Sequence, residues 1–251
     1  MMFLILLINN AFASTLNNEN QSIMSGDSGS EKIITLDEQR KTVEMNTQLS
    51  QEQKNSIIEK INFAEERSKI SVDNKGIDYQ QADIGISVPY YRQINNYYCG
   101  PATKKQTMQY LIGQSDSQQT IASALGTTTA GTDGTKIVSY LNSHQTENYY
   151  IITSPASANH MADCTAKCMA DYFETPIVRV KMQTNQGWSY NSNGHFMNIT
   201  GQLSPISGFE YTVVDPYIQY VDSSNTTGRY TISINVVYAS VMNHFAQHFY
   251  W

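Results

Sequence analysis

The sequence predicts an α+β fold in which helices come first and an antiparallel sheet follows them. Apolar residues recur at helical spacing in several segments up to about residue 173. Beyond Pro176, short extended segments bounded by turn residues take over. The length of 251 residues allows one sizeable domain with an appendage, because a compact core takes about 100–200 residues. Helices followed by a separate run of strands form an α+β arrangement.

The composition excludes one class of partner. Charged residues make up 15% of the chain and the net charge is -6, whereas an average soluble protein has about 25% charged residues. No run of Lys and Arg is present that could follow phosphates or anionic lipids. We therefore expect no nucleic-acid partner, and the sequence gives no indication of oligomeric state.

Residues 1–13 are expected to be a signal peptide. An apolar run from Phe3 to Ile8 is followed by Ala11-Phe12-Ala13, the small-x-small pattern that precedes signal cleavage. The first charged residue is Glu19, so the usual basic start is missing. The run is shorter than the about 20 residues that span a bilayer, so we expect no membrane association after cleavage. The protein is expected to be secreted, with a cell-surface location left open.

Residues 14–83 are expected to be a tether followed by a helical pro-region or stalk. Residues 14–30 are rich in Asn, Ser, Gly and Glu, which is typical of a disordered segment. Ser50 and Gln53 have capping-box spacing, and an apolar stripe then predicts one amphipathic helix, which a second can precede. Its members are Ile57, Ile58, Ile61 and Ala64. Because such a helix cannot fold alone, it either docks on residues 84–251 or projects as a stalk.

The main domain, residues 84–251, contains the predicted mixture of elements. Residues 84–90 are expected to be extended, and a helical or mixed stretch is expected from about residue 232. Helices are expected at 99–112, 117–125, 136–141 and 159–173, the last stopping before Pro176. Strands are expected at 149–153, 177–182, 195–201 and 209–214.

Cys99 is the candidate nucleophile among only three cysteines. Three are too few for a disulfide scaffold, and an odd count leaves at least one thiol unpaired. Cys99 begins a predicted helix, and Pro101 suits the first turn because its missing N–H costs nothing there. The positive end of the helix dipole favours the thiolate. The plain alternative is a buried cysteine that happens to begin a helix.

Three motifs around this cysteine resemble the bacteriocin-leader (double-glycine) peptidase-like family of papain-fold cysteine proteases. They are Val88-Pro89-Tyr90, Gln93 and Tyr98-Cys99-Gly100-Pro101-Ala102. The resemblance implies a papain-like fold, with helices packed on a sheet that carries a histidine and an aspartate. It also implies that Cys99 is the nucleophile and that Gln93 donates a hydrogen bond to the oxyanion, where negative charge develops in the transition state. A solvated loop glutamine is the alternative for Gln93.

The resemblance has a limit. It covers roughly residues 84–217, and leader peptidases of this type are normally fused to a membrane-spanning transporter, which we do not expect here. Double-glycine specificity is therefore not carried over to this chain.

Four of the five histidines are expected to have structural roles. His144 follows a helical stretch and is expected to interact with the helix C-terminus. His244 and His248 lack the acidic base of a zinc-protease motif and are expected at the surface or in packing. His160 lies eight residues before Cys168, a separation of about 12 Å along a helix, which is too far for one zinc ion. We expect buried cysteines there, no metal and no cofactor.

His195 is the candidate base and Asp215 the residue that orients it. The segments 194–201 and 209–216 form a predicted hairpin, and a turn centred on Pro205 would place His195 directly opposite Asp215. A neighbouring carboxylate fixes the imidazole tautomer and supports its positive charge. The same segments match the histidine and aspartate segments of the family. An ordinary cross-strand His-Asp pair is the alternative.

The expected function is that of a secreted cysteine peptidase acting on peptide or protein substrates through Cys99, His195, Asp215 and Gln93. No cofactor is required for this chemistry. Two alternatives stay open. One is a non-catalytic surface binding module that keeps the papain fold, and the other is a cell-wall amidase or acyltransferase with the same site.

Overall fold

The computed structural model describes residues 34–70, 83–145, 149–204 and 208–251. The expected signal peptide, the expected tether at residues 14–30 and the expected turn centre at Pro205 lie outside these residues. Within the described ranges, no helix is both long enough and apolar enough to cross a membrane.

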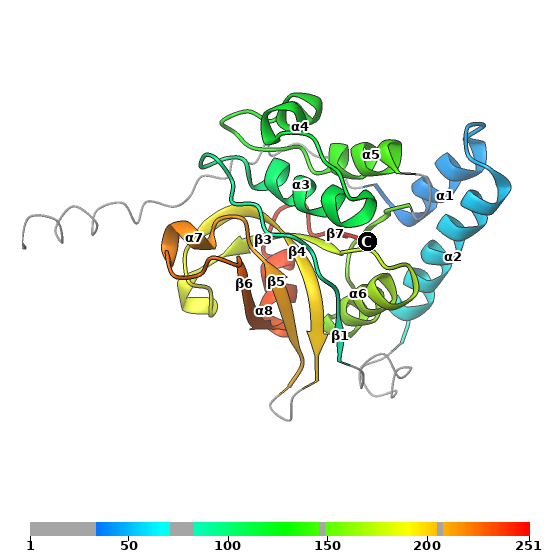
Figure 1. Cartoon of the computed structure of the whole chain (residues 1–251). Helices are drawn as coiled ribbons and strands as arrows, with labels where there is room; N and C mark the ends of the chain where they lie inside the picture. Colours follow the sequence, from blue (N-terminus) through cyan, green and yellow to red (C-terminus); the bar gives the residue numbers. More distant parts are fainter. Residues whose placement is uncertain (1–33, 71–82, 146–148, 205–207) are drawn as a thin grey trace, which may run out of the picture.

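Helices dominate the first part of the domain and strands the second, as predicted (Figure 1). The helices are α1 (Leu36–Met45), α2 (Gln51–Ser68), α3 (Cys99–Ile112), α4 (Gln118–Leu125), α5 (Thr135–His144), α6 (Ala158–Asp171), α7 (Ile218–Val221) and α8 (Ile234–Met242). The strands are β1 (Ile84–Gly85), β2 (Ile152–Thr153), β3 (Ile177–Met182), β4 (Ser192–Leu203), β5 (Glu210–Val214), β6 (Arg229–Ser233) and β7 (Phe249–Tyr250).

The strands form one antiparallel sheet in the order β2-β7-β3-β4-β5-β6, with β1 added to β4. Three details differ from the sequence prediction. The strand expected at 149–153 is reduced to β2, strand β6 and helix α7 were not predicted, and the stretch from 232 divides between β6, α8 and β7. Helix α6 ends at Asp171, just before Phe173 takes a positive φ of 53°. The predicted α+β class itself is confirmed.

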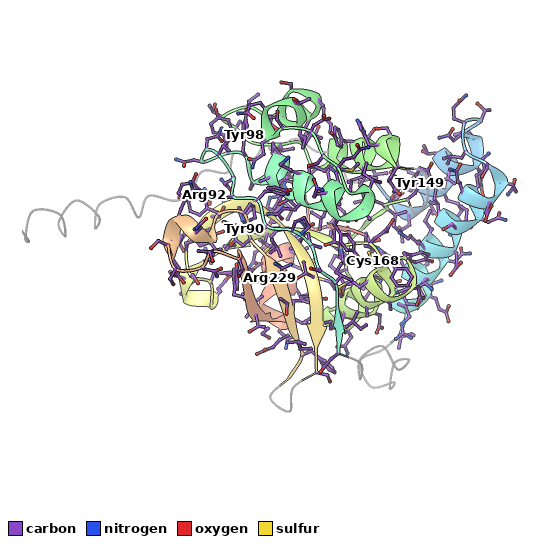
Figure 2. All side chains as sticks on the ribbon, viewed as in Figure 1. Tyr90, Arg92, Tyr98, Tyr149, Cys168 and Arg229 are labelled. Carbon is purple, nitrogen blue, oxygen red and sulfur yellow. The ribbon has the colours of Figure 1, made fainter. Side chains whose placement is uncertain are left out.

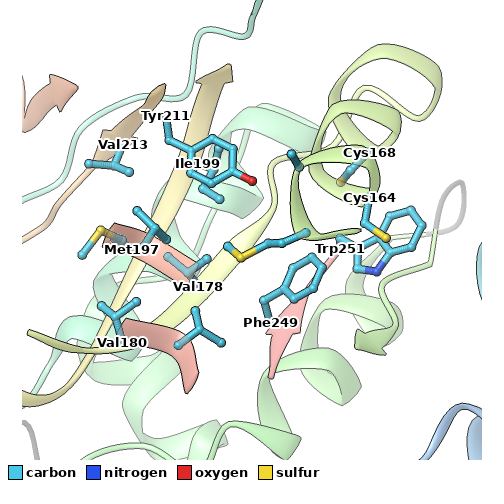
Figure 3. Packing of buried hydrophobic residues seen from close by; sticks show 14 of the residues in the cluster. Cys164, Cys168, Val178, Val180, Met197, Ile199, Tyr211, Val213, Phe249 and Trp251 are labelled. Carbon is cyan, nitrogen blue, oxygen red and sulfur yellow. The ribbon is translucent and has the colours of Figure 1, made fainter. Parts of the chain in front are cut away.

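Two hydrophobic cores cover the two faces of the sheet. Val178, Val180, Met197 and Ile199 alternate onto the face that packs against α6 and α8, together with Phe249 and Trp251 (Figure 3). The intervening residues Ile177 and Phe196 face the opposite way and pack with buried side chains of α3, α4 and α5. Helix α3 therefore lies directly on β4, the strand that carries His195.

Helices α1 and α2 form a hairpin that docks on the rest of the domain beside α6 (Figure 1). The predicted capping box is present, because Gln53 N donates to Ser50 Oγ and Ser50 N to Gln53 Oε1. The predicted stripe faces the first core, with Ile57, Ile61 and Ala64 buried. The helix therefore docks and does not project as a stalk.

Buried charges also join this hairpin to the domain. Lys60 Nζ lies 2.5 Å from a carboxylate oxygen of Glu174, and these side chains are 0% and 1% exposed. Arg67 Nε donates to Asp163 Oδ2 at 2.8 Å, in a second buried ion pair. Glu174 and Asp163 lie outside the hairpin, and the positive charge that pairs with each of them comes from the hairpin.

Candidate active site

Cys99 is the first residue of α3, and only 2% of it is exposed. The N–H groups of a first helical turn have no partner within the helix, so they are available to a negative charge at this end. Gly100 is required for packing, because a Cβ there would stand 2.5 Å from Thr132 Oγ1. The motif therefore holds the thiol at a helix start that is closely covered by a neighbouring loop.

His195 and Asp215 are hydrogen bonded and fully buried. His195 Nε2 lies 2.8 Å from Asp215 Oδ1, and both side chains are 0% exposed. Strand β4 carries the histidine, and the aspartate follows the last residue of β5. The contact that the hairpin predicted is therefore present in the structure.

The register that was used to predict this contact is wrong. Asn198 pairs with Val214, so continuing the ladder by one pair places Asp215 opposite Met197, two residues from His195. An offset of two keeps both side chains on the same face, because residues alternate between faces with a period of two. An irregularity between Ile199 and Gly201 shifts the ladder by one residue and sets this register.

His195 and Asp215 each favour the charged form of the other. Burial lowers the pKa of His195, but the Asp215 carboxylate and the Cys99 side chain outweigh burial and raise it above its ordinary value. Burial raises the pKa of Asp215, and the charge and hydrogen bond of His195 outweigh this and lower it. His195 Nδ1 is buried and makes no hydrogen bond with the described residues. The ring thus uses Nε2 for Asp215, and Nδ1 is the nitrogen that remains for another partner.

Gln93 is buried rather than solvated, with 1% of it exposed. Its Nε2 donates to Asn95 O at 2.7 Å, which occupies one of the two amide hydrogens. Its backbone N–H donates to Pro216 O at 3.0 Å, and its carbonyl accepts from the Tyr220 hydroxyl at 2.8 Å. The backbone of Gln93 is therefore fixed to the segment that follows Asp215.

Two tyrosines bind Asp215 and were missed by sequence reasoning. The hydroxyls of Tyr190 and Tyr230 donate to Asp215 Oδ2 at 2.7 Å and 2.9 Å. The Tyr217 backbone N–H donates to Oδ1 at 2.8 Å. No local pattern distinguishes Tyr190 and Tyr230 among the 17 tyrosines of the chain, so the sequence offered no signal for them.

The other cysteines lie away from this site. In Figure 2, Tyr90 and Arg92 lie toward α7 and Tyr98 lies beside α4, whereas Cys168 lies beside α6 on the side of the α1–α2 hairpin. Cys164 and Cys168 are unpaired and fully buried. Burial raises the pKa of both thiols, and the neighbouring acids Asp163 and Glu174 raise it further. Both are therefore packed, protonated thiols.

The remaining histidines have structural contacts. His144 Nδ1 lies 2.8 Å from Tyr140 O at the end of α5, which is the predicted C-terminal interaction. His160 Nδ1 accepts from Ala156 N at 2.9 Å. His244 and His248 are each 1% exposed, so they belong to packing and not to the surface. In the part of the chain that the structure describes, no group of His, Cys, Asp and Glu has a metal-binding arrangement.

Comparisons with known proteins match a family model and solved structures. The model of the Peptidase_C39 like family matches residues 85–244, a range that includes Gln93, Cys99, His195 and Asp215. Among solved structures, the chain is similar to a digestive procathepsin L 3 of the Tenebrio molitor larval midgut, with 10% sequence identity and a TM-score of 0.46. That similarity covers 86% of this chain and 98% of the other chain. No curated protein matches the sequence.

Proposed function

Because the chain belongs to the Peptidase_C39 like family and is a cysteine peptidase of papain-like fold, we propose that Cys99, His195, Asp215 and Gln93 cleave its substrates. One observation carries the proposal. The buried hydrogen bond from His195 Nε2 to Asp215 Oδ1 leaves Nδ1 for the thiol at the start of α3. A peptidase acts on peptides or proteins, so the substrate contains a scissile amide.

Each residue has a distinct part in the reaction. The Cys99 thiolate attacks the peptide carbonyl carbon, and imidazolium His195 gives its Nδ1 proton to the leaving amine. Water then hydrolyses the thioester, with His195 taking the proton back. Asp215 does not exchange a proton. It holds the ring and stabilises the imidazolium through Nε2.

The oxyanion is proposed to bind between the Cys99 backbone N–H and the Gln93 amide. The Cys99 backbone N–H suits this role because N–H groups at a helix start have no intrahelical acceptor. Gln93 Nε2 supports it because Asn95 O accepts only one of its two hydrogens and fixes the amide plane. The remaining hydrogen is the proposed donor.

Export is part of the proposal and rests on residues 1–13 alone. Their apolar run and the Ala11-Phe12-Ala13 pattern support cleavage by a signal peptidase. No cofactor is needed by the proposed chemistry, because the thiolate and the imidazolium supply the nucleophile and the acid.

The function is tested by the peptides released from a complex protein mixture. The parent protein should generate new termini with a consistent sequence preference, and a Cys99→Ala variant should generate none above background. Iodoacetamide should alkylate Cys99 in the folded parent much faster than Cys164 or Cys168, because Cys99 begins a helix and interacts with His195, whereas burial and neighbouring acids raise the pKa of the other two thiols. Equal cleavage by the variant, or equal alkylation of all three thiols while the protein is folded, would contradict the assignment.

Replacing Gln93 by alanine should lower turnover by about 10²- to 10³-fold, the usual loss for one oxyanion donor. The alkylation rate of Cys99 should stay close to that of the parent, because the donor acts on the substrate oxygen and not on the thiol. Initial rates on a fluorogenic peptide measure the effect.

A matched control is Gln39→Ala. Gln39 lies on helix α1, far from Cys99 in the sequence, and both polar atoms of its side-chain amide are hydrogen bonded to the Ile152 backbone. The substitution should cost stability and leave turnover unchanged. A Gln93→Ala protein that loses alkylation as well as turnover would show that Gln93 supports the structure of the site instead.

A further inference from the structure

The geometry points to Tyr190 and Tyr230 as positioning residues, whose hydroxyls hold Asp215 Oδ2 so that the carboxylate stays ionised with Oδ1 facing His195. This inference rests on the proposed function, because it assigns a role in the same site. Neither tyrosine touches the proposed nucleophile through a hydrogen bond. They act through Asp215.

The sheet brings these groups together from three neighbouring strands. Tyr230 pairs with Val213 in the β5–β6 ladder, and Asp215 N donates to Gly228 O, so Tyr230 and Asp215 lie on the same face. That face also carries His195 from β4. Tyr190 reaches the carboxylate from the segment just before β4 and packs edge-on to the His195 ring, with 5.8 Å between ring centroids.

The hydrogen bonds of Asp215 are complete only with the two tyrosines. An ionised carboxylate has about four acceptor positions. His195 Nε2 and Tyr217 N occupy those of Oδ1, and the Tyr190 and Tyr230 hydroxyls occupy those of Oδ2. Since Asp215 is 0% exposed, water cannot replace a missing donor without a change of structure. A buried charge without these donors is strongly disfavoured.

The surroundings of Asp215 make the tyrosines its main neutral donors. Burial would raise the pKa of Asp215, and the His195 charge and hydrogen bond, followed by the Tyr190 hydroxyl, keep it lowered. The titratable groups that face this cluster are His195, Cys99, Tyr90, Tyr190 and Tyr230. Two arginines nearby in the chain or the sheet have other partners, since Arg92 lies over the Tyr220 ring and Arg229, which pairs with Val214, donates to Val88 O. Neither forms an ion pair with Asp215 in the described residues.

Loss of a hydroxyl should therefore appear at acidic pH. Without one donor, the ionised carboxylate is less stable, so Asp215 takes up a proton at a higher pH than in the parent. A protonated Asp215 no longer supports the imidazolium, so turnover falls. The acid limb of kcat/KM should move upward by about one pH unit for Tyr190→Phe or Tyr230→Phe. The double variant should move it further.

The experiment measures kcat/KM against pH for both single variants and the double variant, beside a matched control. The control is Tyr211→Phe, which removes another buried tyrosine hydroxyl from β5, one that is bonded to Thr165 and not to Asp215. It should lower stability without moving the acid limb. In an Asp215→Asn background, Tyr230→Phe should also leave the acid limb in place, because no carboxyl group remains to be protonated.

A direct titration of the Asp215 carboxyl carbon by NMR separates this inference from the proposed function. If the parent cleaves no peptide while the phenylalanine variants raise the pH of carboxyl protonation, the proposed function fails and the positioning role stands. If the parent is active and the carboxyl titration is the same in parent and variants, the positioning role is overturned. A shift of the acid limb that persists in the Asn background would also overturn it. Since the single variants differ from the parent by one hydroxyl each, they serve even where the double variant does not fold.

Discussion

Replacing His195 by alanine is expected to reduce turnover by about 10⁴-fold, because the proposed general base and acid is removed while substrate binding and the proposed oxyanion donors remain. Rates on a fluorogenic peptide measure the loss. His144→Ala is the matched control, since the described contacts of His144 are with the end of its own helix, where Nδ1 lies near Tyr140 O and Ser143 Oγ and the ring stacks on Tyr140. It should retain full turnover.

The two Asp215 variants should fall between His195→Ala and the parent in a fixed order. Asp215→Asn keeps an oxygen that accepts from His195 Nε2, so it should retain more activity than Asp215→Ala, which leaves the ring and both tyrosine hydroxyls without their acceptor. A folded Asp215→Ala protein as active as the parent would contradict the role of Asp215.

The Asn variant should also change the alkaline side of the pH profile. In the parent, the Asp215 charge opposes burial and holds the pKa of His195 above its ordinary value. Without that charge, burial lowers the pKa, so the imidazolium loses its proton at a lower pH. The alkaline limb of kcat/KM should therefore move to lower pH in Asp215→Asn, and the Tyr211→Phe control should not move it.

Replacing Lys60 by methionine should lower the free energy of unfolding by about 3–5 kcal/mol, because Glu174 is left as a buried charge without its partner. The double variant Lys60→Met with Glu174→Leu should recover most of that loss, since it removes both charges from the same place. Denaturant unfolding followed by circular dichroism measures all three proteins.

Arg40→Met is the matched control for this cycle. The Arg40–Glu65 pair lies within the same hairpin, but its side chains are 23% and 32% exposed, so its loss should cost less than about 1 kcal/mol. If Lys60→Met lowers the free energy of unfolding no more than Arg40→Met does, the expected contribution of the buried ion pair to stability is contradicted.

The same contacts bear on the pro-region interpretation of residues 14–83. Removing the residues before Ile84 would leave Glu174 without Lys60 and Asp163 without Arg67. It would also expose to solvent the hydrophobic core residues that α2 buries. We therefore expect the trimmed protein to lose its folded state. A trimmed protein that stays folded and is more active than the full chain would support an inhibitory pro-region instead.

Local signals in the sequence located several elements closely. The predicted helix at 99–112 has the bounds of α3, because Pro101 suits its first turn and Gly113 ends it with a φ of 69°. The strand at 177–182 has the bounds of β3, since its β-branched run follows Pro176. The ends of these two elements are set by residues close to them in the sequence, so they could be predicted.

Non-local features were not predictable in the same way. The register of β4 and β5 depends on an irregularity between Ile199 and Gly201, and the turn position that the sequence indicates does not reveal this shift. Tyr190 and Tyr230 lie 25 and 15 residues from Asp215, and only strand pairing brings them to its second oxygen. The motifs pointed to the residues that we propose for catalysis, whereas the tyrosines that bind Asp215 come near it only through the pairing of the strands.

Strand β7 has a consequence for how the protein folds. It lies between β2 and β3, and its partners are about a hundred and about seventy positions earlier in the chain. Strands β3 to β6 can pair as successive neighbours while the chain is being synthesised, but the gap beside β3 stays open until residues 249–250 emerge from the ribosome. Closing such long loops is slow, and until then two strand edges are free to pair with other chains. Aggregation during this interval, more than the stability of the finished sheet, should therefore limit the yield of folded protein.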